Sequence, residues 1–221
     1  MVTLMQNPKR AFLEALLLAA AVFVVGILLG VSFESSRLDV INDYYSNSEI
    51  SLMDSIAIER LAGIGAVNCS EMLSSNVRLA DKIYEESYAL EKYEESGKIT
   101  DNLKLAHKKY DSLRTLLWIN TIIAREKCPS SFSSVVYLYE YQPEKLEIRA
   151  MEIVWSRILS DLKQKQGDKM ILIPISVSSN ISSLDSLARS LNVTKYPAVI
   201  INEKQVIYKI ESVSDLEKYL K

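Results

Sequence analysis

The chain has 221 residues, of which 48% are hydrophobic and 24% are charged, with 26 basic and 28 acidic side chains. This near-neutral balance, without long basic blocks, excludes the electrostatic pattern of a nucleic-acid-binding protein. The chain has one histidine, His107, and two cysteines, Cys69 and Cys128. These exclude a zinc site built from Cys and His alone, which needs three or four such ligands. The composition therefore allows one or two domains and predicts no metal or other cofactor.

Residues 15–33 form a run of 19 residues without a charge. As a helix the run is roughly 28 Å long, close to the hydrocarbon thickness of a bilayer. A cleaved signal peptide is the alternative. The run is longer than a usual signal core of about 7–15 residues, and no A-x-A-like cleavage site follows it before Glu34. The sequence therefore predicts an uncleaved signal-anchor, with a transmembrane helix over residues 11–33.

The charges that flank the apolar run differ in sign. Lys9 and Arg10 precede it, whereas Glu34 and further acidic residues follow it. The positive-inside rule therefore places the N-terminus in the cytoplasm and the rest of the chain outside a cell membrane that it crosses once. Gly26 and Gly30 form a G-x-x-x-G pattern, which lets two membrane helices approach closely. A homodimer through these glycines is one interpretation; the other is that small residues are common in membrane helices.

Residues 34–130 are rich in helix formers and poor in proline. One helix is expected over residues 48–61. Two further helices, over residues 69–96 and 101–128, each carry apolar residues on one face. The stripe residues are Leu73, Val77, Ala80, Tyr84 and Tyr88 in the first and Leu103, Ala106, Tyr110, Leu113 and Leu117 in the second. The stripes predict an antiparallel, coiled-coil-like hairpin. An intermolecular coiled coil is the alternative, which the short turn at Gly97 disfavours.

The two cysteines lie symmetrically about the expected hairpin turn. Antiparallel helices joined near Gly97 bring Cys69 and Cys128 side by side, and a disulfide needs such closeness. Disulfides also persist on the extracytoplasmic side. The sequence therefore predicts a structural disulfide. The alternative is a thiol–disulfide exchanger, because residues 128–131 have the form C-x-x-S; against it, a helix C-terminus raises the pKa of a thiol.

From about residue 131 short apolar runs alternate with helical stretches. Strands are expected near residues 135–139, 170–175, 198–201 and 205–210. The helix that begins at Pro143 has an apolar side made of Leu146, Met151, Val154, Trp155, Ile158, Leu159 and Leu162. The order β-α-β-α-β-β-α predicts an α/β fold, in which a parallel pair and an antiparallel hairpin form a four-stranded mixed sheet with helices on both faces. The expected domains are thus residues 34–130 and 131–221.

Residues 191–201, Leu-Asn-Val-Thr-Lys-Tyr-Pro-Ala-Val-Ile-Ile, resemble the helix, loop, cis-proline and strand of the thioredoxin fold. The resemblance extends over roughly residues 131–221 and implies that Pro197 is a cis-proline beside a peptide-binding groove. The family's catalytic C-x-x-C stands between the first strand and the first helix, where this chain has no cysteine. Because a thiolate is the nucleophile of disulfide exchange, the resemblance implies the fold and the groove without the oxidoreductase activity.

The expected groove residues are Gln142, Pro143, Glu144, Tyr196 and Pro197. The functional hypothesis is a membrane-anchored, redox-inactive module that binds, holds or scaffolds another envelope protein. A thiol–disulfide oxidoreductase that uses the cysteine pair is the alternative. A third interpretation is a structural oligomer capped by the C-terminal domain.

The remaining motifs are weaker. His107 lies in the charged stretch of residues 104–109, which predicts a solvated helix face rather than a catalytic histidine. Sequons for N-glycosylation begin at Asn68, Asn180 and Asn192. Because Asn68 is expected to cap a helix, Asn180 and Asn192 are the candidate glycosylation sites.

Overall fold

The computed structural model describes residues 8–95, 101–128 and 132–220. The chain forms two compact units, Met1–Asp43 and Tyr44–Lys221. In the first unit, the stretch Arg10–Ser32 is long and apolar enough to cross a membrane, and none of it is buried. This agrees with the predicted membrane helix in length and composition.

Helix α1 (Pro8–Gly63) extends well beyond the apolar run. A separate helix over residues 48–61 was the expectation, and this is wrong, because α1 has no break before Gly63. The sequence explains the continuity, since residues 31–62 contain neither glycine nor proline. Residues from Tyr44 onward in α1 belong to the second unit.

The second unit contains two long helices, α2 (Cys69–Glu95) and α3 (Asp101–Lys127), that pack together as a hairpin. A capping box begins α2, and its N-cap is Asn68, as predicted. Asn68 Oδ1 accepts a hydrogen bond from the backbone N–H of Glu71 at 3.0 Å, and the Glu71 carboxylate accepts one from the Asn68 N–H at 3.2 Å.

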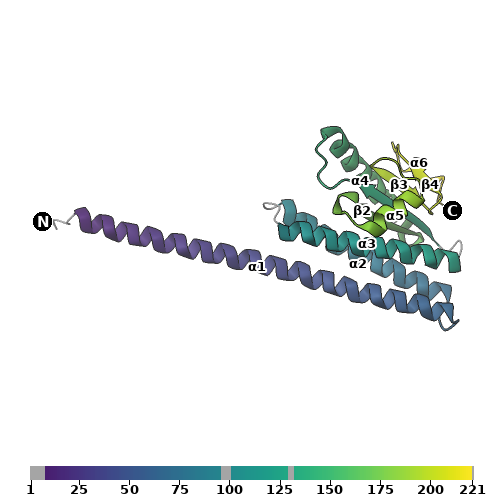
Figure 1. Cartoon of the computed structure of the whole chain (residues 1–221), viewed down its shortest axis with the longest axis horizontal. Coiled ribbons are helices and arrows are strands. Elements are labelled where there is room, and N and C mark those ends of the chain that lie inside the picture. Colours follow the sequence, from purple (N-terminus) through teal and green to yellow (C-terminus); the bar gives the residue numbers. More distant parts are fainter. Residues whose placement is uncertain (1–7, 96–100, 129–131, 221) are drawn as a thin grey trace. The chain divides into compact units, whose positions relative to one another are not determined.

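A four-stranded sheet follows the hairpin (Figure 1). Its strands are β1 (Ser133–Tyr139), β2 (Met170–Ser176), β3 (Ala198–Ile201) and β4 (Gln205–Ile207). The remaining elements are helices α4 (Leu146–Gln166), α5 (Ser182–Ser190) and α6 (Ser214–Glu217) and the 3-10 turns η1 (Gly167–Lys169) and η2 (Val177–Ser179). The spatial order is β2-β1-β3-β4, with β1 and β2 parallel and the other two pairs antiparallel. This confirms the predicted mixed sheet.

Both faces of the sheet are covered. On one face, Trp155, Leu159 and Leu162 of α4 pack with alternate residues of β1 and β3 and with Leu216 of α6. The intervening β1 residues, such as Val136, point to the opposite face and are also fully buried. Helices α2 and α3 pack against β2, so the helical hairpin and the sheet form one compact unit. The domain boundary expected near residue 131 falls inside this unit.

The predicted hairpin seam is confirmed for α3 and only in part for α2. All five stripe residues of α3 are at most 7% exposed, and so are Val77 and Ala80 of α2. Tyr84 and Tyr88 are instead 44% and 54% exposed. Their places in the core are taken by Met72, Leu79, Ile83 and Leu90. The reason is that α2 packs against α1 and β2 as well as α3. Its buried side is therefore broader than the side predicted from packing on α3 alone, and it is centred on different residues.

Three polar side chains meet where α1, α2 and α3 pack. The amide of Asn120 on α3 donates to Asn76 Oδ1 on α2 at 2.7 Å and to Ser55 Oγ on α1 at 3.3 Å. Ser55 itself donates to Asn76 at 3.1 Å. All three residues are at most 3% exposed. A buried polar group is costly unless it is hydrogen-bonded, so this network favours the one helix register that satisfies all three side chains.

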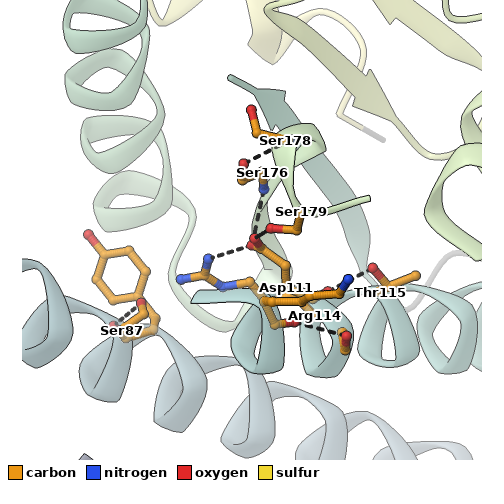
Figure 2. A network of polar contacts seen from close by, with 10 residues as sticks. Ser87, Asp111, Arg114, Thr115, Ser176, Ser178 and Ser179 are labelled. Atoms are coloured by element: carbon orange, nitrogen blue, oxygen red, sulfur yellow. Dashed lines mark hydrogen bonds and ion pairs between the residues drawn. The ribbon is translucent and has the colours of Figure 1, made fainter. Parts of the chain in front are cut away.

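Hydrogen bonds join helix α3 to the sheet at two places along its length. Near its C-terminus, Glu203 in the β3–β4 turn accepts hydrogen bonds from Arg125 at 2.6 Å, from the indole of Trp118 at 3.1 Å and from Ser134 at 2.7 Å. Nearer its N-terminus, Asp111 reaches the end of β2 (Figure 2). Both sets of hydrogen bonds join segments more than 60 residues apart in the chain.

The disulfide joins the start of α2 to the end of α3 and so closes the hairpin. Cys69, at the start of α2, is bonded to Cys128, just after α3, with Cα atoms 5.7 Å apart. This confirms the predicted pairing. Beside it, the ammonium of Lys127 contacts the carboxylate of Glu59 on α1 at 2.9 Å.

Candidate protein-binding site

The loop that precedes β3 contains a cis peptide bond between Tyr196 and Pro197, as the sequence resemblance implies. Pro197 is buried and Tyr196 is half-buried. Strand β3 pairs with β1 so that Ala198 lies opposite Leu138. Pro197 therefore stands at the carboxyl end of β1, where residues 140–145 leave the sheet.

Tyr208, which follows β4, holds this loop in place. Its hydroxyl accepts hydrogen bonds from the backbone N–H of Thr194 at 3.0 Å and from the Thr194 hydroxyl at 3.3 Å, and it donates to the Asn192 carbonyl at 3.5 Å. Burial, together with the nearby charge of Asp185, raises the pKa of Tyr196 above its usual value. The Tyr196 hydroxyl is therefore protonated at neutral pH and can donate a hydrogen bond to a bound chain.

The loop between β1 and α4 is tied down through its backbone. The Glu140 N–H donates to the Glu152 carboxylate at 2.8 Å, and the Tyr141 N–H donates to the Ser178 hydroxyl at 3.0 Å. Gln142 adopts a positive φ of 52°. Both cysteines of the chain lie elsewhere, in the disulfide, so this loop offers no thiol.

The five predicted groove residues lie in two loops at one end of the sheet. Gln142 and Glu144 are exposed and Pro143 is half-buried in the loop before α4. Tyr196 and Pro197 lie in the loop before β3. The β1–β3 register brings both loops to the carboxyl end of β1.

His107 is not on a solvated face, so that expectation is wrong. Its imidazole packs on the Tyr141 ring, with the ring centres 4.3 Å apart, and it is half-buried. Burial, assisted by the positive charge of Arg114, lowers the pKa of His107 to about 4. The sequence did not show this contact, because the partner ring comes from a loop that lies more than 30 residues further along the chain.

We expect His107 to stay neutral throughout the physiological pH range. A folded pKa below the unfolded value of about 6.5 means that its contribution to stability is complete above that value and is lost as the pH falls towards about 4. Since the chain has one histidine, its imidazole proton resonances need no assignment in an NMR titration. The expected midpoint is about 4, rising towards the usual value in Tyr141→Ala. A midpoint near 6.5 in the unaltered protein would contradict the packing.

The first half of α4 exposes more apolar surface than expected. Leu146, Met151 and Val154 belong to its predicted apolar side, yet they are 77%, 37% and 51% exposed. They are not core residues: the buried residues of α4 are Trp155, Leu159 and Leu162, and Val154, which directly precedes Trp155, lies on a different side of the helix.

A pocket of about 390 Å³ lies between this part of α4 and the segment that follows β4. Its lining residues are Ala150, Met151, Val154, Trp155, Tyr208, Lys209, Ile210 and Glu211. The walls are mostly apolar, and an ion pair between Lys209 and Glu211 at 2.6 Å is part of the lining. Tyr208 belongs both to this pocket and to the hydrogen bonds of the cis-proline loop.

Sequence reasoning missed this pocket, since none of the five predicted groove residues lines it. One signal was available. The predicted apolar side of α4 has seven large apolar residues between Leu146 and Leu162, of which only Trp155, Leu159 and Leu162 are buried. Surplus apolar surface on a helix indicates a contact beyond the core.

Within the described ranges, no three His, Cys, Asp or Glu side chains gather as they do in a metal site. Asn180 and Asn192 are both exposed and both have positive φ angles, of 50° and 56°. Their glycosylation stays a prediction. Asn68 is engaged as the helix cap, as expected.

Comparison with known proteins adds no relative. No protein-family description, no curated protein and no solved structure matches this chain. The chain combines an N-terminal apolar helix, a disulfide-closed helical hairpin and a four-stranded mixed sheet.

Proposed function

We propose that this protein is a single-pass, membrane-anchored module that binds a segment of another envelope protein at the pocket between α4 and residues 208–211. The observation that carries the proposal is an uncovered apolar helix surface beside an apolar pocket. Exposed apolar patches of this kind are typical of protein-binding sites.

A thioredoxin-like fold is part of the proposal. It is supported by the parallel pair β1–β2 joined through α4, the antiparallel hairpin β3–β4 and the cis-proline before β3. The loop that would carry the dithiol has no cysteine, which favours binding over thiol exchange. Gln142, Glu144 and Tyr196 lie at the same end of the sheet and extend the proposed binding surface.

The proposed topology has the N-terminus in the cytoplasm and Tyr44–Lys221 outside. Lys9 and Arg10 before the apolar run support this orientation by the positive-inside rule. The bond between Cys69 and Cys128 agrees with it, because disulfides persist in oxidising compartments.

Site-specific photo-crosslinking in native membranes tests the binding site. A photoreactive amino acid at Val154 is expected to give a discrete adduct with another protein. The matched control is Leu105 on α3, because the two side chains are 51% and 53% exposed. Equal adducts at Val154 and Leu105 would contradict the proposal. So would the absence of an adduct both at Val154 and in a second variant that carries the photoreactive amino acid at Met151.

A competing substitution makes the result specific. Met151→Glu places a charge in the pocket wall, and we expect it to abolish the adduct formed at Val154. Leu105→Glu adds the same charge elsewhere and is expected to leave that adduct unchanged. Loss of the adduct in both variants would point to a general effect of charge and count against the pocket.

A further inference from the structure

Strand β4 lies at one edge of the sheet. The spatial order β2-β1-β3-β4 gives it one hydrogen-bonded neighbour, β3, with Ile200 opposite Val206. Within the described ranges, the backbone of residues 205–208 makes no hydrogen bond outside its pairing with β3. A strand with one neighbour leaves outward-pointing N–H and C=O groups that can pair with another chain. We call residues 205–208 the open edge.

The sequence of the open edge does not oppose pairing. Native edge strands are commonly kept apart from other chains by proline or by charges along the strand. Residues 205–208 are Gln-Val-Ile-Tyr, without proline, glycine or charge. Valine, isoleucine and tyrosine are residues that favour β-strands. The open edge therefore has the composition of a strand that pairs on both sides, and its length suits a short partner segment.

The proposed pocket adjoins the open edge. Tyr208 belongs to both, and the residues that follow it form the same wall of the pocket. Ile207 packs against the core cluster that contains Trp155 of α4, so the side of β4 that carries Ile207 faces α4. Because side chains alternate along a strand, every second side chain of an added strand turns to this same side. The exposed Val154 and the pocket lie there.

Two exposed lysines, Lys204 and Lys209, flank the open edge. Lys209 pairs with Glu211 at 2.6 Å, but both side chains are at least 71% exposed, so this pair contributes little and leaves Lys209 able to contact a partner. A second copy that paired antiparallel, centred on the open edge, would set Lys204 opposite Lys209, and like charges directly opposite one another destabilise a sheet. The lysines therefore disfavour self-pairing and favour a partner with acidic residues.

We propose that the segment bound by this protein is an extended strand that pairs with the open edge and carries apolar residues at alternate positions and an acidic residue at one or both ends. The inference rests on the proposed function and names the kind of segment that the pocket receives. In this mode of binding, main-chain hydrogen bonds give affinity and pockets for alternate side chains give specificity. The open edge supplies the first and the pocket supplies the second.

Photo-crosslinking at two positions measures the conformation of the bound segment. A photoreactive amino acid is placed at Gln205 or at Lys209 of the full chain in native membranes, and mass spectrometry locates the linked residue of the partner. A paired strand keeps one partner residue for each residue of the edge, so the two linked sites should lie about four residues apart. A helix rises about 1.5 Å per residue instead of about 3.3 Å, so a helical segment would place them about nine apart. That spacing, or an adduct with a second copy of this chain, would overturn the proposal.

Hydrogen exchange tests the main-chain pairing. The adduct formed through Val154 is purified and compared with the unreacted protein. The amides of the open edge should exchange severalfold more slowly in the adduct, whereas those of α3 should not change. A Val154 adduct without slower exchange at the open edge would leave the proposed function standing and show that strand pairing is wrong. Absence of an adduct at Val154, Gln205 and Lys209 alike would overturn both.

Charge reversal tests the acidic residues of the partner. Lys204 does not line the pocket, so Lys204→Glu should lower the yield of the Val154 adduct severalfold through the charge of the partner alone. The control is Lys104→Glu on α3, where the side chain is 63% exposed, and the yield is expected to stay unchanged. Equal yields in the two variants would overturn the acidic part of the proposal. Tryptophan emission checks folding, because Trp118 and Trp155 are buried in the second unit.

Discussion

Replacing Asp111 by alanine is expected to lower the free energy of unfolding of Tyr44–Lys221 by about 3–5 kcal/mol, as breaking other buried ion pairs does. The Asp111 side chain is completely buried, and Arg114, whose side chain is 7% exposed, lies 3.3 Å from it. Without the carboxylate, the guanidinium is left in a buried place with no counter-charge.

The carboxylate also joins two parts of the fold. It accepts hydrogen bonds from the backbone N–H of Ser176 at 3.1 Å and from the hydroxyl of Ser179, at the end of β2 and in η2 (Figure 2). Asp111→Ala removes the acceptor for both donors, and an unsatisfied buried donor costs about 1–3 kcal/mol. Asp111→Asn keeps an acceptor oxygen, so we expect it to cost less than the alanine variant.

The chain offers a matched control for this experiment. Asp101 and Lys104 form the same i,i+3 pair on the same helix at 3.2 Å, but their side chains are 98% and 63% exposed. Asp101→Ala should therefore cost less than about 1 kcal/mol. Both tryptophans, Trp118 and Trp155, are buried in the second unit, so their fluorescence during urea unfolding reports on that unit alone.

A double variant identifies the cause of the loss. Adding Arg114→Leu to Asp111→Ala removes the uncompensated charge, and part of the lost stability is expected to return. The remainder measures the connection to Ser176 and Ser179. If Asp111→Ala lowers the free energy of unfolding no more than Asp101→Ala does, then the buried Asp111–Arg114 pair does not stabilise the packing of α3 on the sheet.

The features that sequence predicted well depend on local order along the chain. The capping box at Asn68 needs only a spacing of three residues. The disulfide followed from the symmetry of Cys69 and Cys128 about one turn, and the α3 seam followed from helical periodicity. Each of these is fixed within a hairpin, so no knowledge of distant segments was required.

The features that it missed are set by distant neighbours. Tyr84 and Tyr88 have the spacing of core residues, yet they are exposed because α1 and β2 pack against a different side of α2. His107 lies in a charged stretch, yet it is half-buried because Tyr141 packs on it. The charge of a stretch predicts the average exposure of its residues, whereas a single contact decides the exposure of one of them.

The candidate site shows the same division. The cis-proline at Pro197 was predicted from a short local resemblance. The pocket was not, because it forms between α4 and a segment more than 50 residues away, and its exposed lining residue Val154 looked like core. Periodicity indicates that a helix has an apolar side, and the elements that pack on the helix decide how much of that side remains uncovered.

Removing the disulfide is expected to cost about 4 kcal/mol in the free energy of unfolding, from the chain-entropy cost of a loop that the sequence separation of 59 residues defines. The bond links the start of α2 to the end of α3, so the unfolded chain gains most of the hairpin's freedom when the bond is absent. The variant that carries Cys69→Ala and Cys128→Ala tests this without leaving reactive thiols.

Reduction of the unaltered protein is the matched comparison. The reduced protein and the double alanine variant should lose similar amounts of stability, since both release the same loop. The seam residues Tyr110, Leu113 and Leu117 stay buried on α3 either way, so we expect the hairpin to remain folded but to unfold at lower urea concentration. A loss below about 1 kcal/mol would mean that the packing of α2 on α3 already holds the ends together in the unfolded ensemble, and the bond would then not be the structural link that the hairpin geometry indicates.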